Sequence, residues 1–256
     1  MGLSEKEFSD LVKKDFDKAE RVLAMVEDPW TRNVFGSCII KDLIARDLDA
    51  AISFAAQGSF RSSSKELATA VHKQRGMDAL LTWIDAIEPG DKDKGDAQSI
   101  YKAKASQAAL EIVARENPDR ASQWVVTHAG TPHVDGYTLY RIAGAMNSDP
   151  VLQIKWLDEL PIAQGMRGGA IAVVLADYAR SDLYAAGQWL AEQELTPMHD
   201  RAIYEFAFQA KASEPEAATL WAEQITDEAL RKQILDNIRQ YRLFLEKSAE
   251  QSSGDN

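Results

Sequence analysis

Residues 117–124 read Asn-Pro-Asp-Arg-Ala-Ser-Gln-Trp, and residues 214–221 read Glu-Pro-Glu-Ala-Ala-Thr-Leu-Trp. An acidic or amide residue followed by proline is typical of a helix start, because its side chain can accept orphan backbone N–H groups and proline fits the first helical position. A residue before proline also avoids the α region, so the preceding helix ends there. Each stretch therefore predicts a turn between two helices, with the Trp on the second.

The same arrangement recurs along the chain. An aromatic residue closes an ungapped 23-residue pattern six times, at spacings of 29, 41, 32, 33 and 32 residues. These residues are Phe54, Trp83, Trp124, Trp156, Trp189 and Trp221. Seven positions before each aromatic stand the predicted turn residues Asp47, Gly76, Asn117, Asp149, Asp182 and Glu214. A period near 33 is typical of stacked supersecondary units that bury their apolar faces against one another.

Apolar positions before each turn follow the period of a helix. Fourteen residues before Trp124 stands Leu110, and Val113 follows it by three, so both lie on one helix face. We therefore expect an all-α fold, a right-handed stack of antiparallel helical hairpins with about six to seven repeats of 32–33 residues. The expected organisation is one α-solenoid domain over 1–247. Within it, 1–29 are an N-terminal capping helix that ends near Glu27, 30–225 are repeats and 226–247 a C-terminal capping helix, and 248–256 are a disordered tail.

The spacing Asn117-Pro118-x-x-Ala121-x-x-Trp124, repeated with Glu214-Pro215-x-x-Ala218-x-x-Trp221, resembles the junction between tetratricopeptide repeats. That family has Gly and Tyr four and seven residues after the Trp, where this chain has His128 and Thr131 after Trp124. The resemblance is therefore to tetratricopeptide-like or HEAT-like helical-hairpin repeats as a class. It implies a scaffold that binds proteins or peptides without catalysis.

Composition excludes several kinds of partner. The net charge of −11 and a pI near 4.9 disfavour nucleic acid and anionic membrane surfaces, which require basic patches. The single cysteine, Cys38, favours a reducing compartment. We expect a cytoplasmic protein with a protein or peptide partner. If an export signal has been removed, the location is instead periplasmic or secreted.

Exposed aromatic and Arg side chains on the long helices are the candidate binding residues. They are Tyr140, Arg141, Arg167, Arg201 and Tyr204. A second pattern places a cation 22 residues before most of the aromatics, at Arg32, Arg61, Lys102 and Arg167. These cations either pair with carbonyls or acids at the end of the preceding short helix, such as Asp158, or form a basic ladder for an acidic peptide.

No sequence signal for a metal or cofactor matches fully. The loop from Asp91 lacks the glycine and glutamate that a calcium loop requires at its sixth and twelfth positions, which hold Asp96 and Lys102. His128 and His133 lie in a loop without zinc-ligand spacing. We expect no catalytic residue, metal or cofactor. The alternative is an enzyme on an α/α scaffold that acts on a glycan or other polymer by carboxylate acid/base chemistry.

Overall fold

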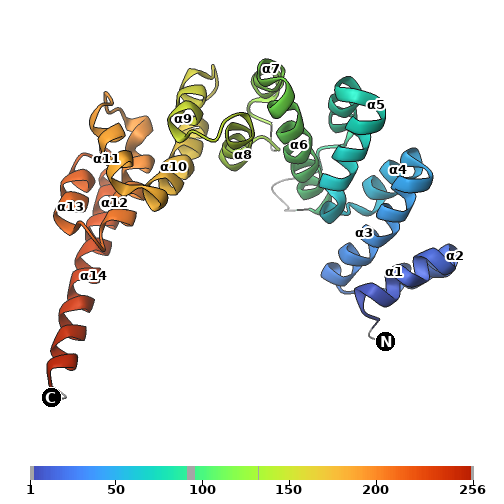
Figure 1. Ribbon diagram of the computed structural model, residues 1–256, viewed down its shortest axis with the longest axis horizontal. Coiled ribbons are helices and arrows are strands. Elements are labelled where there is room, and N and C mark those ends of the chain that lie inside the picture. The colour runs from blue at the N-terminus through green and yellow to red at the C-terminus, as the bar shows by residue number, and fades with distance from the viewer. Residues whose placement is uncertain (1–2, 91–95, 132, 255–256) are drawn as a thin grey trace. The chain divides into compact units, whose positions relative to one another are not determined.

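The computed structural model describes residues 3–90, 96–131 and 133–254, with side chains as far as residue 248. These residues form fourteen α-helices and two 3-10 turns, and no strand occurs among them (Figure 1). The all-α prediction is confirmed. The bounds are α1 Glu5–Lys14, α2 Phe16–Ala24, α3 Pro29–Arg46, α4 Leu48–Gly58, η1 Arg61–Ser63, α5 Ser64–Ala86, α6 Ala97–Glu116, α7 Pro118–His128, α8 Gly136–Met146, α9 Pro150–Glu159, α10 Gln164–Ser181, α11 Leu183–Ala191, η3 Pro197–His199, α12 Asp200–Ala210, α13 Pro215–Glu223 and α14 Glu228–Gly254.

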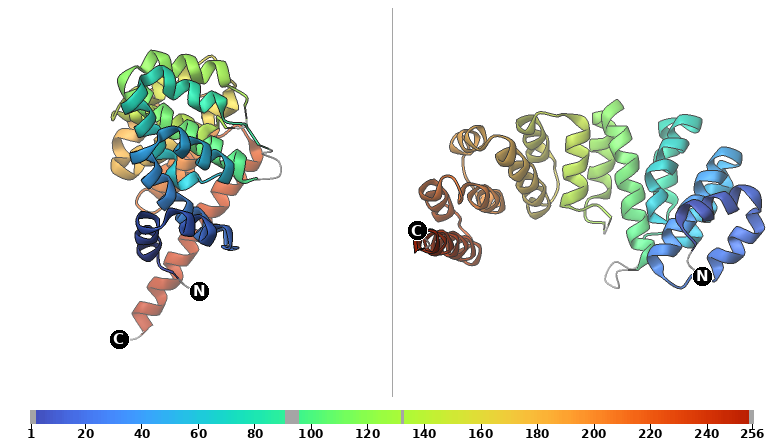
Figure 2. Two further views of the ribbon diagram at one scale, coloured as in Figure 1. Left: turned by 90° about the vertical axis from the view of Figure 1, so that its right-hand side faces the viewer. Right: turned by 60° about the horizontal axis from the view of Figure 1, so that its bottom comes forward.

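The chain divides into two compact units. The N-terminal unit is Met1–Gln123 with Thr131–Val134, and the C-terminal unit is Trp124–Gly130 with Asp135–Asn256. Within each unit, a helix packs mainly on the next helix in sequence and on the one after it, as α8 packs on both α9 and α10. The right-hand view of Figure 2 shows this sequential order inside each unit. A core built from such near neighbours forms without strands or long crossings.

One residue separates the two helices of several successive pairs. Asp47 donates its backbone N–H to the Leu43 carbonyl oxygen at 2.7 Å, which ends α3, while its carboxylate accepts the Ala50 N–H at 3.0 Å, which starts α4. Its extended backbone (φ −154°, ψ 101°) turns the chain between them. Asp15, Asn117 and Asp182 repeat both bonds with nearly the same φ. At Asp47, Asn117 and Asp182 the predicted turn residue therefore acts through its side chain.

Replacing Asp47 by alanine is expected to lower the free energy of unfolding by about 1 kcal/mol, since it leaves the first N–H groups of α4 without a side-chain acceptor. Asparagine at this position keeps the acceptor oxygen. The free energy of unfolding of this variant should stay within about 0.3 kcal/mol of the wild-type value. Urea unfolding followed by circular dichroism measures both. An equal loss in the two variants would contradict a capping role.

Gly76 makes the corresponding turn inside α5. Its backbone (φ 84°, ψ −179°) is non-helical and divides α5 into segments 64–75 and 77–86. This positive φ disfavours residues with a Cβ, so glycine takes the place of aspartate here.

Two predicted boundaries are wrong. Residues 1–29 do not hold one capping helix, because Asp15 ends α1 and starts α2, and Val22 occupies the place of the aromatic residue. At the other end, α14 continues to Gly254 instead of ending at Lys247, so the predicted tail is helical as far as it is described. Residues Asp91–Gly95 of the considered calcium loop lie outside the described residues.

All six repeated aromatic residues lie on the second helix of a pair, counting segment 77–86 of α5 as one. Trp83 and Trp124 are buried, and the other four are half-buried. Three positions before four of the aromatics stands an alanine with no exposed surface: Ala51, Ala121, Ala186 and Ala218. Such small side chains let neighbouring helices come close beneath the ring.

Candidate functional site

A groove runs between the first helices of two successive pairs in the N-terminal unit. Its volume is about 800 Å³. Helix α3 supplies one wall and segment 64–75 of α5 the other. The lining residues are Lys41, Ile44, Ala45, Lys65, Glu66, Thr69, Ala70, Lys73 and Gln74.

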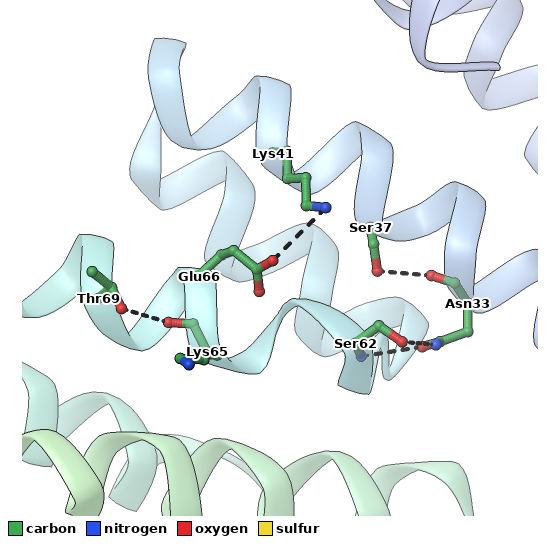
Figure 3. Close-up of polar contacts among 7 residues, drawn as sticks. All are labelled: Asn33, Ser37, Lys41, Ser62, Lys65, Glu66 and Thr69. Atoms are coloured by element: carbon green, nitrogen blue, oxygen red, sulfur yellow. Dashed lines mark hydrogen bonds and ion pairs between the residues drawn. The ribbon is translucent and has the colours of Figure 1, made fainter. Parts of the chain in front are cut away.

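The two walls are joined next to the groove by an asparagine. The Asn33 side-chain amide donates to Ser62 Oγ, and the Ser62 N–H donates to Asn33 Oδ1 at 3.4 Å (Figure 3). Ser37 Oγ also donates to the Asn33 carbonyl oxygen at 2.9 Å. The two Asn33–Ser62 bonds fix the start of α3 to η1, which leads into α5. A groove whose walls are held in place loses less conformational entropy when it binds.

The groove carries excess positive charge. Lys41 Nζ on α3 lies 3.8 Å from Glu66 Oε1 on α5, and both side chains are about half exposed (Figure 3). Solvent screens such a pair, so it contributes at most about 1 kcal/mol to stability. Lys65 and Lys73 are also exposed and lie on the same wall. The lining thus contains three lysines and one glutamate, although the whole chain carries −11.

The spacing of the two lysines on α5 suits an extended ligand. At 1.5 Å per helical residue, their eight positions span about 12 Å along the helix. An extended chain covers this distance in about four residues. Thr69 lies midway, and its hydroxyl donates to the Lys65 carbonyl oxygen at 2.8 Å. The wall can therefore contact two carboxylates of one extended segment.

Most of the cations that stand 22 residues before a repeated aromatic residue bind the end of a helix. Arg32 Nη1 donates to the Leu23 carbonyl oxygen at 3.4 Å, and the Lys102 ammonium donates to that of Ile87. Arg167 donates to the Asp158 carbonyl oxygen and lies 3.9 Å from its carboxylate. These are the contacts that the pairing alternative predicts. Arg231 extends the pattern, because its Nη1 donates to the Ile225 carbonyl oxygen at 2.8 Å.

Burial affects Lys102 beyond this capping contact. Its side chain is buried, and desolvation lowers the pKa of its ammonium while Asp85 and Glu88 oppose that shift. Arg61, in contrast, is exposed and lines a separate pocket with Trp30 and Phe60.

The five residues predicted to bind a partner lie on three helices of the C-terminal unit. Tyr140 and Arg141 are half-buried on α8, and the Tyr140 hydroxyl donates to Asp177 on α10. Arg167 is held against the end of α9, as described above. Arg201 and Tyr204 contact each other.

The Arg201–Tyr204 contact is a cation–π pair on α12. The guanidinium carbon lies 5.4 Å from the ring centroid, and Arg201 Nε lies 3.4 Å from Glu205 Oε1. Tyr140 and Arg167 therefore contact another helix of their own unit, and the role of all five residues in binding stays a prediction.

The histidines make local contacts. His72 Nε2 lies 3.0 Å from Glu116 Oε2, and the His128 ring stacks on Trp124 with centroids 3.9 Å apart. His133 Nε2 and Thr131 Oγ1 are 3.2 Å apart. His199 Nδ1 accepts the Thr196 N–H at 3.1 Å. Among the residues that the structure describes, no three His, Cys, Asp or Glu side chains gather as metal ligands do.

Sequence reasoning did not find the groove lysines. Lys65 and Lys73 lie on one helix face by their spacing, but solvated helices commonly carry such lysines. Their position opposite Lys41 depends on how α3 packs beside α5, for which no local signal exists.

Within 3–90, 96–131 and 133–254, no helix has the length and apolar character that a membrane crossing requires. Comparison of the chain with models of protein families, with characterised proteins and with solved structures finds no match.

Proposed function

We propose that this protein is a non-catalytic scaffold that holds an acidic, extended segment of a partner protein in the α3/α5 groove. The observation that carries the proposal is the excess of lysines in the lining of that groove within a strongly acidic chain. A basic site selects a ligand of opposite charge. The net charge of −11 makes whole copies of the protein repel one another.

The proposal includes an architecture. We infer a right-handed α-solenoid of hairpin repeats, similar to tetratricopeptide or HEAT arrays, because helices pack mainly on their near neighbours in sequence. In such arrays the first helices of successive pairs form a continuous ligand-binding face. In the N-terminal unit the α3/α5 groove is formed by first helices, and in the C-terminal unit the candidates Tyr140, Arg141 and Tyr204 also lie on first helices.

Charge reversal in the groove tests this function. The probe is a fluorescein-labelled peptide of Gly and Ser with two glutamates four positions apart, and fluorescence anisotropy gives its Kd. Replacing both Lys65→Glu and Lys73→Glu is expected to weaken binding at least about tenfold, which corresponds to about 1.4 kcal/mol. Binding by the wild type should also weaken as salt rises, since these charges are exposed.

The matched control is the double variant Lys13→Glu, Lys18→Glu, which makes the same charge change on the exposed surfaces of α1 and α2. Its Kd should stay within about twofold of the wild type, because these sites are outside the groove and screened by salt. An equal loss in both double variants would show that only net charge matters. Failure of the wild type to bind the peptide would refute the proposal that the groove holds an acidic segment.

A further inference from the structure

A second pocket lies in the C-terminal unit, between the short helices α11 and α13 with α12 beneath them. Its volume is about 590 Å³. Its lining includes the aromatic rings of Tyr184, Phe206 and Trp221 and the carboxylate of Glu214, and its small residues are Gly187, Ala210 and Ala217. Its chemistry is therefore different from that of the α3/α5 groove.

Two of the rings have a defined geometry. Phe206 and Trp221 meet edge to face, with centroids 5.8 Å apart and planes at 75°. Tyr184 is 83% exposed, which is unusual for a large aromatic side chain. Gly187 keeps the floor open, because a Cβ there would lie 3.0 Å from Phe206 Cζ. The pocket thus offers accessible aromatic surface beside a tightly packed base.

Glu214 differs from the aspartates and the asparagine that stand at its position in other helix pairs. Asp15, Asp47, Asn117 and Asp182 each use the side chain to cap the following helix. Glu214 makes no such capping bond at the start of α13. Its carboxylate is exposed, and the pocket lining contains neither lysine nor arginine. A negative charge therefore stands beside aromatic rings, and no cation among the lining residues neutralises it.

We propose that this pocket binds an arginine side chain presented by a partner protein. A guanidinium is planar and weakly hydrated, so it stacks on aromatic faces such as those of Tyr184 and Trp221. Its N–H fork pairs with a carboxylate, which Glu214 supplies at the edge of the pocket. This site goes beyond the acidic-segment groove and does not depend on it, since ligand charge, helices and residues all differ.

The test compares N-acetylarginine amide with N-acetylcitrulline amide, a neutral ligand of nearly the same shape. Both are titrated into the full-length protein, and the Trp221 indole N–H signal is followed by NMR after assignment with Trp221→Phe. The arginine ligand is expected to saturate with a Kd of roughly 1–10 mM. The citrulline ligand should bind at least about fivefold more weakly, because it lacks the charge that Glu214 and the rings recognise.

Variants then locate the interaction. Glu214→Gln should remove most of the preference for arginine, and Tyr184→Ala should weaken arginine binding several-fold. Glu223→Gln is the matched control, because Glu223 is an exposed residue of α13 outside the pocket lining, and it should keep the wild-type preference. Unchanged thermal unfolding would show that the variants are folded. Equal binding of the two ligands, or a Glu214→Gln variant that still prefers arginine, would overturn the proposal.

Discussion

Replacing Trp83 by alanine is expected to lower the free energy of unfolding by about 3–5 kcal/mol, the range for removing a large aromatic ring from a core. Trp83 is only 7% exposed and lies on segment 77–86 of α5 beside the fully buried Leu80 and Ile84. Loss of the ring leaves a cavity between closely packed helices, which relax only in part. Its indole N–H is buried and has no hydrogen-bond partner among the described residues, so we attribute the stabilisation to packing.

Trp30→Ala is the matched control. The Trp30 side chain is 71% exposed in the first turn of α3, and its removal should change the free energy of unfolding by less than about 0.5 kcal/mol. Urea unfolding monitored by circular dichroism compares the two variants. Similar losses would show that the repeated aromatic position has no special place in the core.

The parts of the fold that the sequence predicts are those with local causes. A capping side chain such as Asp47 or Asp182 acts on N–H groups three residues away, so its effect is visible in a short stretch of sequence. Tryptophan is rare and large, and its place seven residues after the turn position marks the second helix of a pair, as at Trp83 and Trp124. These signals do not require knowledge of the neighbouring pairs.

The turn at Asp15 shows where local signals become insufficient. It makes the same two bonds as Asp47, but neither proline nor an aromatic residue at position 22 marks it. The sequence Lys14-Asp15-Phe16 therefore continues the helical pattern, and a single helix was the natural expectation. A capping aspartate alone is a weaker signal of a turn than a capping aspartate followed seven residues later by an aromatic residue.

The two proposed binding surfaces depend on packing, and for that reason they could not be predicted from the sequence. Lys41 and Lys65 share a groove only because α3 lies beside α5. Glu214 and Tyr184 belong to different helix pairs and line one pocket because α11 and α13 both pack on α12. Arg167 also depends on packing, because its contact with Asp158 at the end of α9, the pairing alternative, joins two helices.

Asp200 is a further residue whose role comes from packing. The sequence places it in the first turn of α12, where an acidic residue is common. In the structure it is only 5% exposed and reaches the segment before α14. Its carboxylate accepts the Thr226 N–H at 2.9 Å, the Thr226 hydroxyl at 2.6 Å and the Asp227 N–H at 2.8 Å. One side chain thus connects α12 to the start of the last helix.

Replacing Asp200 by alanine is expected to lower the free energy of unfolding by about 2–3 kcal/mol. Hydrogen bonds to a charged acceptor are strong, and the donors of Thr226 and Asp227 all lose the same carboxylate. Amide hydrogen exchange should accelerate most in α14, whose start these bonds hold. Asp200→Asn retains an acceptor oxygen and should lose less. The matched control is Asp236→Ala on the exposed side of α14, which should change stability by less than about 0.5 kcal/mol. If exchange in α14 is unchanged by Asp200→Ala, packing of α14 on α12 and α13 is sufficient to hold it, and the carboxylate does not fasten the C-terminal helix.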